Sequence, residues 1–439
     1  MAHFRTKLAP FIICLVVFGC NSESPTPAPA KSEAPEPQPS TKQEITPDDA
    51  SAVQALTEAG FILKTSADNV VIEASMNADS DIAATLNHLK GIPNVQALAL
   101  SGPGMGDGGM ENLTQLSLLK RLELSDSAIG DETLTHVAAL PNVEVLGLRR
   151  TGVTDAGLEA INSLPKVRAI DLRNSNITDD GIVHFSQLKT LVDLQLEKAD
   201  ITDKGVENMS GLKLRNINLN YCTSISNKSL EVLGAMTTLE GIQLDYTKIT
   251  DDGMANVAKL TKLKRLRIRG TDVTGEGLAN IANATEMQRL ELRDTSLDDD
   301  GLKTISALPK VNYLDISECR IVSPEGMKSI GKLTGLKYLG FWETKLNDEA
   351  FNEFGNLTDL EELNLKATGV TDESVPTMLK MQKLKKLNLA GTQLSDEGFK
   401  QLSQLPSLVE LNVANTSIGF DIIDELAEKE GLTVVEFEN

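Results

Sequence analysis

A glycine-rich hexapeptide, residues 104–109, is the first candidate for chemistry, because it satisfies the pattern G-x-G-x-x-G. In dinucleotide-binding proteins this pattern follows a strand and opens a helix, and an acidic residue about twenty positions later binds the ribose. Glu123 stands at about that distance. However, Met110 occupies the position that Leu134 and Leu158 hold in the two following segments, with no insertion. We therefore interpret the glycines as a permissive turn and expect no cofactor.

Three histidines are the second candidate, because His88, His136 and His184 follow one another at intervals of 48 residues. That interval is two periods of the repeat described below, so neighbouring histidines should lie about 10 Å or more apart. Zinc ligands lie about 2 Å from the metal, so these side chains cannot share one ion. No Ser-His-Asp, Cys-His or paired-carboxylate arrangement is recognisable either. We expect no metal site at the histidines and no enzymatic activity.

Acidic runs are the third candidate, and they recur where helices are expected to start. Asp179-Asp180, Asp251-Asp252 and Asp298–Asp300 are examples. Several carboxylates close together could bind calcium, a hard cation that prefers oxygen ligands. The interpretation that we favour is that they complement the positive end of the helix dipole. The calcium alternative stays open at this point.

The elements that carry these residues are defined by a repeat. Fourteen times in succession, every 23 to 25 residues, the chain has the pattern apolar-x-x-apolar-x-apolar, beginning with residues 95–100, and residues 432–437 add a fifteenth copy. A period of this length indicates stacked structural units. We number repeat positions from the first apolar residue of each copy. The fourteen copies begin at Val95, Leu119, Val143, Val167, Leu191, Leu214, Leu239, Leu263, Met287, Val311, Leu336, Leu360, Leu384 and Leu408.

Residues 143–166 show what one repeat should build. Leu146 and Leu148 alternate with period two, which predicts a strand with one buried face. Thr154 is a favoured helix N-cap, and the apolar residues that follow it recur every three positions, as on one face of a helix. Pro165 should end that helix. Stacked units of this kind place the strands in one parallel sheet, and the wider helices then lie on the outside of a curved solenoid.

The motif Leu-x-x-Leu-x-Leu-x-x-(Thr/Asn/Cys)-x-x-Ile-Thr-Asp-x-Gly-Leu resembles the leucine-rich repeat, most closely its cysteine-containing, ribonuclease-inhibitor-like subfamily. Residues 214–230, with Cys222 at the ninth position, match it best. The resemblance implies an α/β, right-handed leucine-rich-repeat solenoid, a horseshoe with a parallel concave sheet, outer helices and about 14–15 repeats of 24 residues. It is nearly silent on function, because the family binds unrelated partners.

The first residues have the pattern of a bacterial lipoprotein signal. Two basic residues precede an apolar run, residues 11–18, which is too short to span a bilayer as a helix. Residues 17–20, Val-Phe-Gly-Cys, resemble a lipobox. We therefore expect residues 1–19 to be a signal peptide and Cys20 to carry lipid; an ordinary secretion signal is the alternative. Asn21 follows, whereas an aspartate there retains some lipoproteins at the inner membrane, so we expect the outer membrane of the cell envelope.

Three further regions follow the expected signal. Residues 20–47 are rich in proline, which predicts an extended tether. Residues 48–74 should form an N-terminal cap with a helix and a hairpin, because a solenoid needs a cover for the open end of its core. Residues 75–439 should form the repeat domain.

Charge and cysteine content limit the partners. The formal net charge is −21, whereas a nucleic-acid-binding protein needs a basic surface, so we expect no nucleic acid as partner. Cys222 and Cys319 share repeat position 9 but lie four repeats apart, about 20 Å. A disulfide requires Cα atoms within about 7 Å, so we expect two unpaired buried thiols. We also expect the protein to be a monomer.

Arginine and aromatic side chains predict the binding surface. All four tyrosines, the tryptophan and most arginines lie in the strand segments at positions that the core does not use. Such residues are typical of interface hot spots; the alternative is a structural ladder across the strands, since strands favour aromatic residues in any case. The candidate partner-binding residues are Arg265, Arg267, Arg269, Arg289, Arg293, Tyr221, Tyr246, Tyr313, Tyr338 and Trp342.

Together these observations predict a non-catalytic binding protein. We expect a lipoprotein, tethered to a membrane only by its lipid, that recognises a protein or peptide of the cell envelope through its concave face. Carbohydrate or cell-wall binding, with the aromatic rings as stacking platforms, is the first alternative. A passive envelope scaffold is the second.

Overall fold

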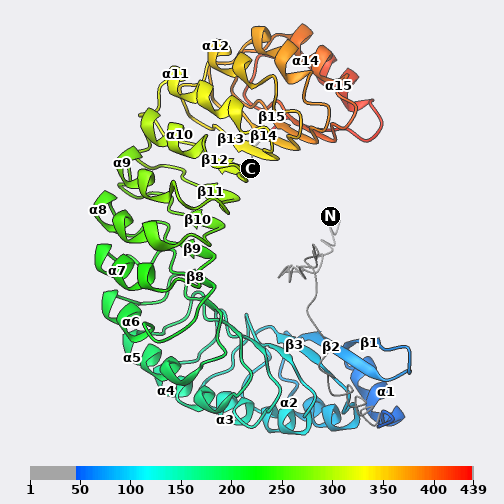
Figure 1. Ribbon diagram of the computed structural model, residues 1–439. Helices are drawn as coiled ribbons and strands as arrows, with labels where there is room; N and C mark the ends of the chain where they lie inside the picture. Colours follow the sequence, from blue (N-terminus) through cyan, green and yellow to red (C-terminus); the bar gives the residue numbers. More distant parts are fainter. Residues whose placement is uncertain (1–45, 438–439) are drawn as a thin grey trace, which may run out of the picture. The chain divides into compact units, whose positions relative to one another are not determined.

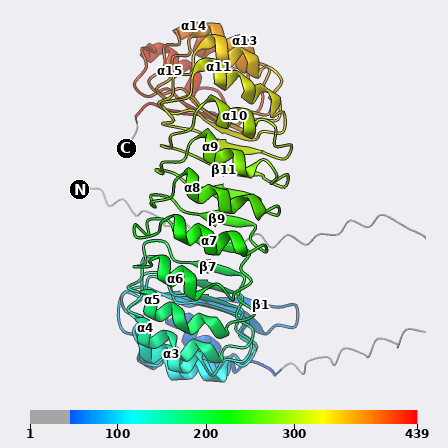
Figure 2. The ribbon, with the colours of Figure 1, turned by 60° about the vertical axis from the view of Figure 1, so that its left-hand side comes forward.

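The computed structural model describes residues 46–437, so the expected signal peptide, Cys20 and most of the expected tether lie outside the described residues. Residues 46–437 form an open arc in which strands line the inner side and helices the outer side (Figure 1). The view in Figure 2 shows the outer helices stacked one above another, one layer per repeat. The predicted fold, a curved solenoid with a concave sheet, is confirmed.

The concave sheet has 17 strands in the described part of the chain. From β2 to β17 each strand pairs in parallel with the next, because a helical connection returns the chain to the same end of the sheet, whereas β1 pairs with β2 antiparallel. The strands are β1 Ile62–Thr65, β2 Val71–Asn77, β3 Ala97–Ser101, β4 Arg121–Glu123, β5 Val145–Gly147, β6 Ala169–Asp171, β7 Asp193–Gln195, β8 Asn216–Asn218, β9 Gly241–Gln243, β10 Arg265–Arg267, β11 Arg289–Glu291, β12 Tyr313–Asp315, β13 Tyr338–Gly340, β14 Glu362–Asn364, β15 Lys386–Asn388, β16 Glu410–Asn412 and β17 Thr433–Val435.

The outer layer consists of short helices, many of which continue as 3₁₀ turns (η). The α-helices are α1 Ala50–Glu58, α2 Ala83–Leu86, α3 Asp131–Val137, α4 Asp155–Leu158, α5 Asp179–Ile182, α6 Asp203–Asn208, α7 Asn227–Ala235, α8 Asp251–Met254, α9 Gly275–Leu278, α10 Asp299–Ile305, α11 Pro324–Met327, α12 Asp348–Phe351, α13 Val375–Met378, α14 Asp396–Leu402 and α15 Phe420–Ala427. The 3₁₀ helices are η1 Asn87–Gly91, η2 Met110–Gln115, η3 Ala160–Ser163, η4 Val183–Gln187, η5 Ala255–Lys259, η6 Ala279–Ile281, η7 Lys328–Lys332, η8 Asn352–Phe354 and η9 Asp372–Ser374. None of the helices within residues 46–437 has the length and apolar character that crossing a bilayer would demand.

The core is a single continuous cluster between the sheet and the helices. Repeat positions 1, 4 and 6 point into it, as Val143, Leu146 and Leu148 show by being completely buried. The helical stripe contributes Leu158 and Ile161 from the other side. The alternation seen in the sequence therefore gave the correct inward and outward directions for the strand residues.

The aspartates at helix starts have a role that the dipole interpretation missed, because they join neighbouring repeats. Asp155 at the start of α4 accepts hydrogen bonds from the backbone N–H and the hydroxyl of Thr178 in the next repeat, at 2.9 and 2.6 Å. Thr154 likewise donates its hydroxyl to Asp131 of the repeat before it, instead of capping its own helix as we expected. The same bond recurs from Thr202, Ser226, Thr274, Ser323, Thr371 and Ser395. Residues 46–437 contain no group of three or more acidic, histidine or cysteine side chains that could hold a metal.

The N-terminal segment consists of α1 and the β1–β2 hairpin. Asp49 caps α1 by accepting the N–H of Ser51 at 2.8 Å, and Gly60 follows the end of the helix in the left-handed conformation. Strand β2 continues in register along β3, so the hairpin supplies the first strand of the parallel sheet as well as covering its end.

The glycine motif is a turn of the first repeat. Met110 is completely buried at the start of η2, in the slot where later repeats place leucine. Gly104 lies so close to the backbone of Ser80 that any side chain there would collide with it. Gly109 has a φ of 83°, which glycine adopts without strain. Close approach to the neighbouring turn accounts for two of the glycines without any nucleotide.

The two cysteines of the repeat domain are free and buried. The thiol of Cys222 donates to the carbonyl of Leu196 at 3.3 Å, and that of Cys319 to the carbonyl of Leu292 at 3.1 Å. Burial raises the pKa of Cys222 to about 12 and that of Cys319 to about 11, so both remain thiols at neutral pH. The expectation that they are unpaired is confirmed.

Candidate functional site

The candidate site is the concave patch. We define it as the residues at repeat positions 3, 5 and 7 of the five repeats that contain β9–β13; positions 3 and 5 lie in the strand, and position 7 lies just after it. The strand registers place Arg265, Arg289, Tyr313 and Tyr338 in one row across four adjacent strands, as predicted. The patch consists of Gly241, Gln243, Asp245, Arg265, Arg267, Arg269, Arg289, Glu291, Arg293, Tyr313, Asp315, Ser317, Tyr338, Gly340 and Trp342.

A completely buried carboxylate organises two of the arginines. Asp245 has 0% exposure and accepts the Nε of Arg267 at 2.5 Å and the Nε of Arg269 at 2.8 Å. It also accepts the backbone N–H of Arg269 at 2.9 Å. Burial raises the pKa of Asp245 to about 6, although the positive charge and hydrogen bonds of Arg269 act to lower it. Asp245 is thus ionised at neutral pH only because the guanidinium groups offset the cost of its burial.

The row at position 3 forms a stack of three planar groups. The guanidinium of Arg289 lies 3.5 Å from the ring centroid of Tyr313, and this ring lies 4.0 Å from that of Tyr338 with an interplanar angle of 5°. The Nε of Arg289 also donates to Glu291 at 2.7 Å. Both faces of the Tyr313 ring are therefore covered by neighbours within the protein.

A second stack lies at position 7. The guanidinium of Arg293 lies 4.2 Å from the ring centroid of Trp342 and donates to Glu318 at 2.8 Å. The ammonium of Lys366 lies 5.0 Å from the same ring. The indole N–H of Trp342 is shielded from solvent and has no hydrogen-bond partner among residues 46–437. A buried donor without a partner is uncommon and costly.

Arg265 differs from the other arginines of the patch. Its guanidinium lies across β9, where Gly241 has no side chain, and it donates to the amide oxygen of Asn216 at 2.6 Å. Within residues 46–437 it bonds no carboxylate, although Arg289 is its neighbour in register. Of the nearby acids, Glu291 bonds Arg289, whereas Asp245 bonds Arg267 and Arg269.

The expectation for Tyr221 and Tyr246 was wrong in one respect. Both lie beyond the ends of β8 and β9, in a turn where their φ angles are 60° and 55°. Their rings stack at 4.9 Å and both side chains are partly exposed, so they form a separate aromatic pair beside the concave patch.

The two arginines at repeat position 7 are less exposed than their place outside the core suggests. The side chains of Arg269 and Arg293 are only 21% and 32% exposed because they are held in ion pairs. Truncation of Arg269 must therefore affect folding as well as any binding. The remaining predicted residues of the patch are where the row analysis placed them.

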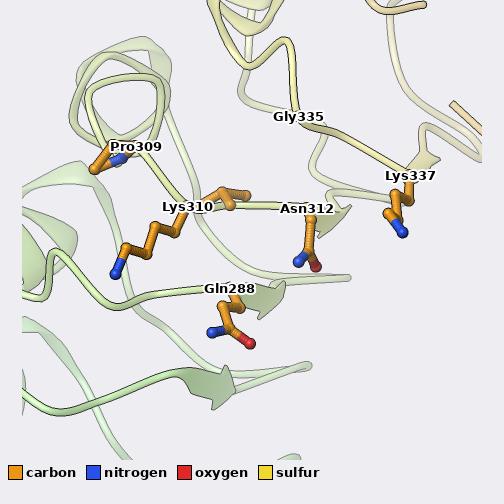
Figure 3. Close-up of a pocket in the computed structure, with 7 residues that line it drawn as sticks. Gln288, Pro309, Lys310, Asn312, Gly335 and Lys337 are labelled. Atoms are coloured by element: carbon orange, nitrogen blue, oxygen red, sulfur yellow. The ribbon is translucent and has the colours of Figure 1, made fainter. Parts of the chain in front are cut away.

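Two hollows of about 380 Å³ each flank the patch at opposite ends of its strands. Figure 3 shows the first, where Gln288, Asn312 and Lys337 extend from the segments that lead into β11, β12 and β13. The second lies past the strand ends, between Tyr246 and Ile321. Lys310 and Lys337, which line the first hollow, pair with Glu286 and Glu361, so their charges are offset by surface ion pairs.

Comparisons with known proteins agree with the architecture. A leucine-rich-repeat region model matches residues 295–438, and a second leucine-rich-repeat model matches residues 187–210 and 259–282. No curated protein sequence matches the chain significantly. The described residues thus have the leucine-rich-repeat fold, and the matched segments carry its sequence pattern.

Several solved structures share this fold. A leucine-rich-repeat protein of Leptospira interrogans has 19% identity and a TM-score of 0.54, covering 82% of this chain and 99% of its own. The yeast Rad7–Elc1 complex has 19% identity and a TM-score of 0.55, covering 76% and 84%. The Arabidopsis receptor kinase HAESA ectodomain, solved with an IDA peptide hormone, has 14% identity and a TM-score of 0.52, covering 88% and 76%. At these identities the likeness establishes the fold alone.

Proposed function

We propose that the protein is a non-catalytic binding module that recognises a protein or peptide through the concave patch. The observation that carries the proposal is the concentration of five arginines, two tyrosines and the only tryptophan on four adjacent strands, β10–β13, and the residues directly after them, in an otherwise acidic chain. Arginine, tyrosine and tryptophan dominate binding hot spots. The HAESA structure with a peptide and the Rad7–Elc1 complex support the proposal, because in both the same fold occurs together with a peptide or protein partner.

Carbohydrate binding is the weaker alternative for a geometric reason. Sugars stack on exposed aromatic faces, but Tyr313 is covered by Arg289 on one side and Tyr338 on the other. Trp342 has Arg293 and Lys366 near its ring. What the patch offers to a ligand is mainly the N–H edges of guanidinium groups, which suit hydrogen-bond acceptors.

The finer classification and the location belong to the same proposal. Cys222 at position 9, buried with its thiol on the carbonyl of Leu196, supports the cysteine-containing, ribonuclease-inhibitor-like subfamily. The lipobox-like residues 17–20 support a lipid anchor on Cys20 and a place in the cell envelope, at the outer membrane of a bacterium. The proline-rich residues 20–47 would then separate the solenoid from the membrane surface.

The anchor has a direct test. Cys20→Ser removes the thiol that would carry the lipid, so the full-length variant is expected to move from the membrane fraction to the soluble fraction. Cys222→Ser, which alters a buried thiol of the repeat domain, should leave the distribution unchanged. Sedimentation of Cys20→Ser with membranes after detergent-free washing would rule out a lipid at this position.

The binding site has a second test, in which Arg293→Ala and Trp342→Ala are combined. The Arg293–Glu318 pair is partly exposed and worth about 1 kcal/mol or less, so the variant should fold. Loss of a hot spot costs about 2 kcal/mol of binding, or about thirtyfold in affinity. The measurement is capture of envelope proteins by the immobilised protein, followed by titration of the captured partner.

Arg173→Ala is the matched control for this double variant. Arg173 occupies the same repeat position on β6 and pairs with Asp171 at 2.6 Å, at similar exposure to the Arg293 pair. Its truncation should leave partner affinity within about twofold of wild type. Equal affinity of wild type and the Arg293/Trp342 double variant would place the site elsewhere on the solenoid.

A further inference from the structure

One arginine of the concave patch is held in place without an anionic partner. The absence of a side chain at Gly241 leaves room for the Arg265 guanidinium to lie across β9 and reach the amide oxygen of Asn216, at 2.6 Å. Asn216 in turn donates to Asp193 at 3.1 Å, which orients its oxygen toward the arginine. The guanidinium is therefore positioned by a neutral acceptor. Its other N–H groups have no partner within residues 46–437 and can bind a ligand.

The arginine next to it in register is already neutralised. Arg265 and Arg289 are direct neighbours in register, but their guanidinium groups turn apart, one across β9 to Asn216 and the other onto the ring of Tyr313 on β12. Arg289 also has a carboxylate, since its Nε bonds Glu291, whereas Arg265 has none among residues 46–437. A carboxylate of a ligand bound to the Arg265 guanidinium would form charge-assisted hydrogen bonds with it.

The charge of the whole patch points the same way. Its five arginines face three carboxylates, those of Asp245, Glu291 and Asp315, whereas the residues that border it at repeat position 8 include the acids Asp294, Glu318 and Glu343. This excess of positive charge lies within a chain whose net charge is −21. The concave patch is thus a small basic island in an acidic protein.

The surroundings of the patch limit the length of the anion. Toward the N-terminus, β7 and the residues after it present Asp193 and Glu197 on the same side of the sheet, with no arginine among positions 3, 5 and 7. These carboxylates would repel a long polyanion such as a nucleic acid strand. From β10 to β13 the distance is about 15 Å, which an extended peptide spans with about five residues.

We infer that the partner presents a short acidic segment, about five residues long, and that one of its side-chain carboxylates binds the guanidinium of Arg265. The inference rests on the proposed function and specifies the chemistry of the partner at that same site. The stacked rings of Tyr313 and Tyr338 continue the row beyond Arg289 and would contact the rest of the segment.

The test uses the full-length protein in detergent and fluorescein-labelled peptides of five glutamates, five lysines, or alternating glycine and serine. By fluorescence anisotropy at low salt, only the glutamate peptide should bind, and its affinity should fall steeply at higher salt, as expected for exposed charges. Arg265→Ala should weaken binding at least tenfold. Arg265 is exposed, and the one hydrogen bond that it makes within residues 46–437 is to a neutral amide, so this variant should fold as wild type does.

Arg121→Ala is the matched control, because Arg121 is an exposed arginine at the same repeat position on β4, six strands away. It removes the same charge and should leave glutamate-peptide affinity unchanged. Failure of the glutamate peptide to bind at low salt, or equal effects of the two substitutions, would overturn the inference. Stronger binding of a ten-residue oligothymidylate than of the glutamate peptide would also overturn it, in favour of a nucleic acid.

Failure of this inference and failure of the proposed function give different results. If an envelope protein is captured and lost with the Arg293/Trp342 double variant, but glutamate peptide neither binds nor competes, the binding function stands and the acidic segment is rejected. If the double variant captures its partner as wild type does, the concave patch itself is rejected.

Discussion

Leu266→Asp is expected to unfold the centre of the solenoid under conditions in which the wild-type protein is stable. Leu266 is 1% exposed on β10, between Ile242 of β9 and Leu290 of β11 in register. Removing a buried leucine costs about 2–5 kcal/mol, and the introduced carboxyl group would have no partner in the apolar layer. We therefore expect a loss of stability on the order of 4 kcal/mol or more.

The loss should spread along the chain, because each repeat is stabilised by its neighbours. Thermal unfolding followed by circular dichroism should show a midpoint lowered by many degrees, and hydrogen exchange should show the loss of protection in β9–β11 first. Gln243→Asp is the matched control: it places a carboxylate beside Arg267 on the outward side of the sheet and should leave the midpoint nearly unchanged. A wild-type midpoint for Leu266→Asp would contradict the inward direction of this residue.

The inward direction of Leu266 could be predicted because it depends only on periodicity. Alternation with period two determines which strand residues share a face, and the repeat length determines which residues become neighbours. The same reasoning places Arg265, Arg289, Tyr313 and Tyr338 in one row from the sequence alone. Residue directions and registers follow from the pattern, which is why the predicted row is confirmed.

The turn after each strand had a signal that we did not use. Position 8 adopts a positive φ in all fourteen repeats, including those with Tyr221, Tyr246 and Lys198. Residues that tolerate this conformation, namely glycine, asparagine and aspartate, occupy position 8 in half of the repeats. They are Gly102, Asp126, Asn174, Gly270, Asp294, Gly391 and Asn415. Alignment of that column would have moved Tyr221 and Tyr246 out of the strands.

The pairing of individual side chains could not be predicted from rows. Arginine is long enough to reach acids on several neighbouring strands, so the sequence left open whether Asp245 offsets Arg265 and Arg289 or pairs with others. Packing decides this: Asp245 is completely buried, and only Arg267 and Arg269 reach it. The sequence likewise indicates which surface carries the residue types typical of hot spots. The chemistry of the ligand, however, depends on which N–H groups remain free once these side chains have paired with one another.

Arg269→Ala should destabilise the protein more at alkaline than at acidic pH, because it removes a partner of the buried Asp245. In the wild-type protein burial raises the pKa of Asp245 to about 6, above the value of about 3.9 in an unfolded chain. A group whose pKa is raised by folding favours the folded state most at low pH, and this contribution is lost as pH rises through the folded pKa. In the wild-type protein this contribution of Asp245 to stability is therefore lost once the pH is above about 6.

Without the positive charge of Arg269, the pKa of Asp245 should rise further. The variant should therefore continue to lose stability as the pH rises above 6, whereas the wild-type protein should not. At pH 8 the difference from wild type should reach about 3 kcal/mol, at the lower end for breaking a buried ion pair because Arg267 remains. At pH 5, where Asp245 is largely protonated in both proteins, most of this difference should disappear. Urea unfolding at several pH values between 5 and 8 measures it.

Asp245→Asn separates this effect from any other consequence of the substitution. Asparagine keeps an oxygen that can accept the backbone N–H of residue 269 but has no titrating group, so Arg269→Ala in that background should cost little and show no pH dependence. An equal loss of stability at pH 5 and pH 8 in the single variant would show that Asp245 is not its source. Because Arg269 supports the fold in this way, loss of binding in Arg269→Ala at neutral pH does not by itself locate the partner, whereas loss in Arg265→Ala or in the Arg293/Trp342 double variant does.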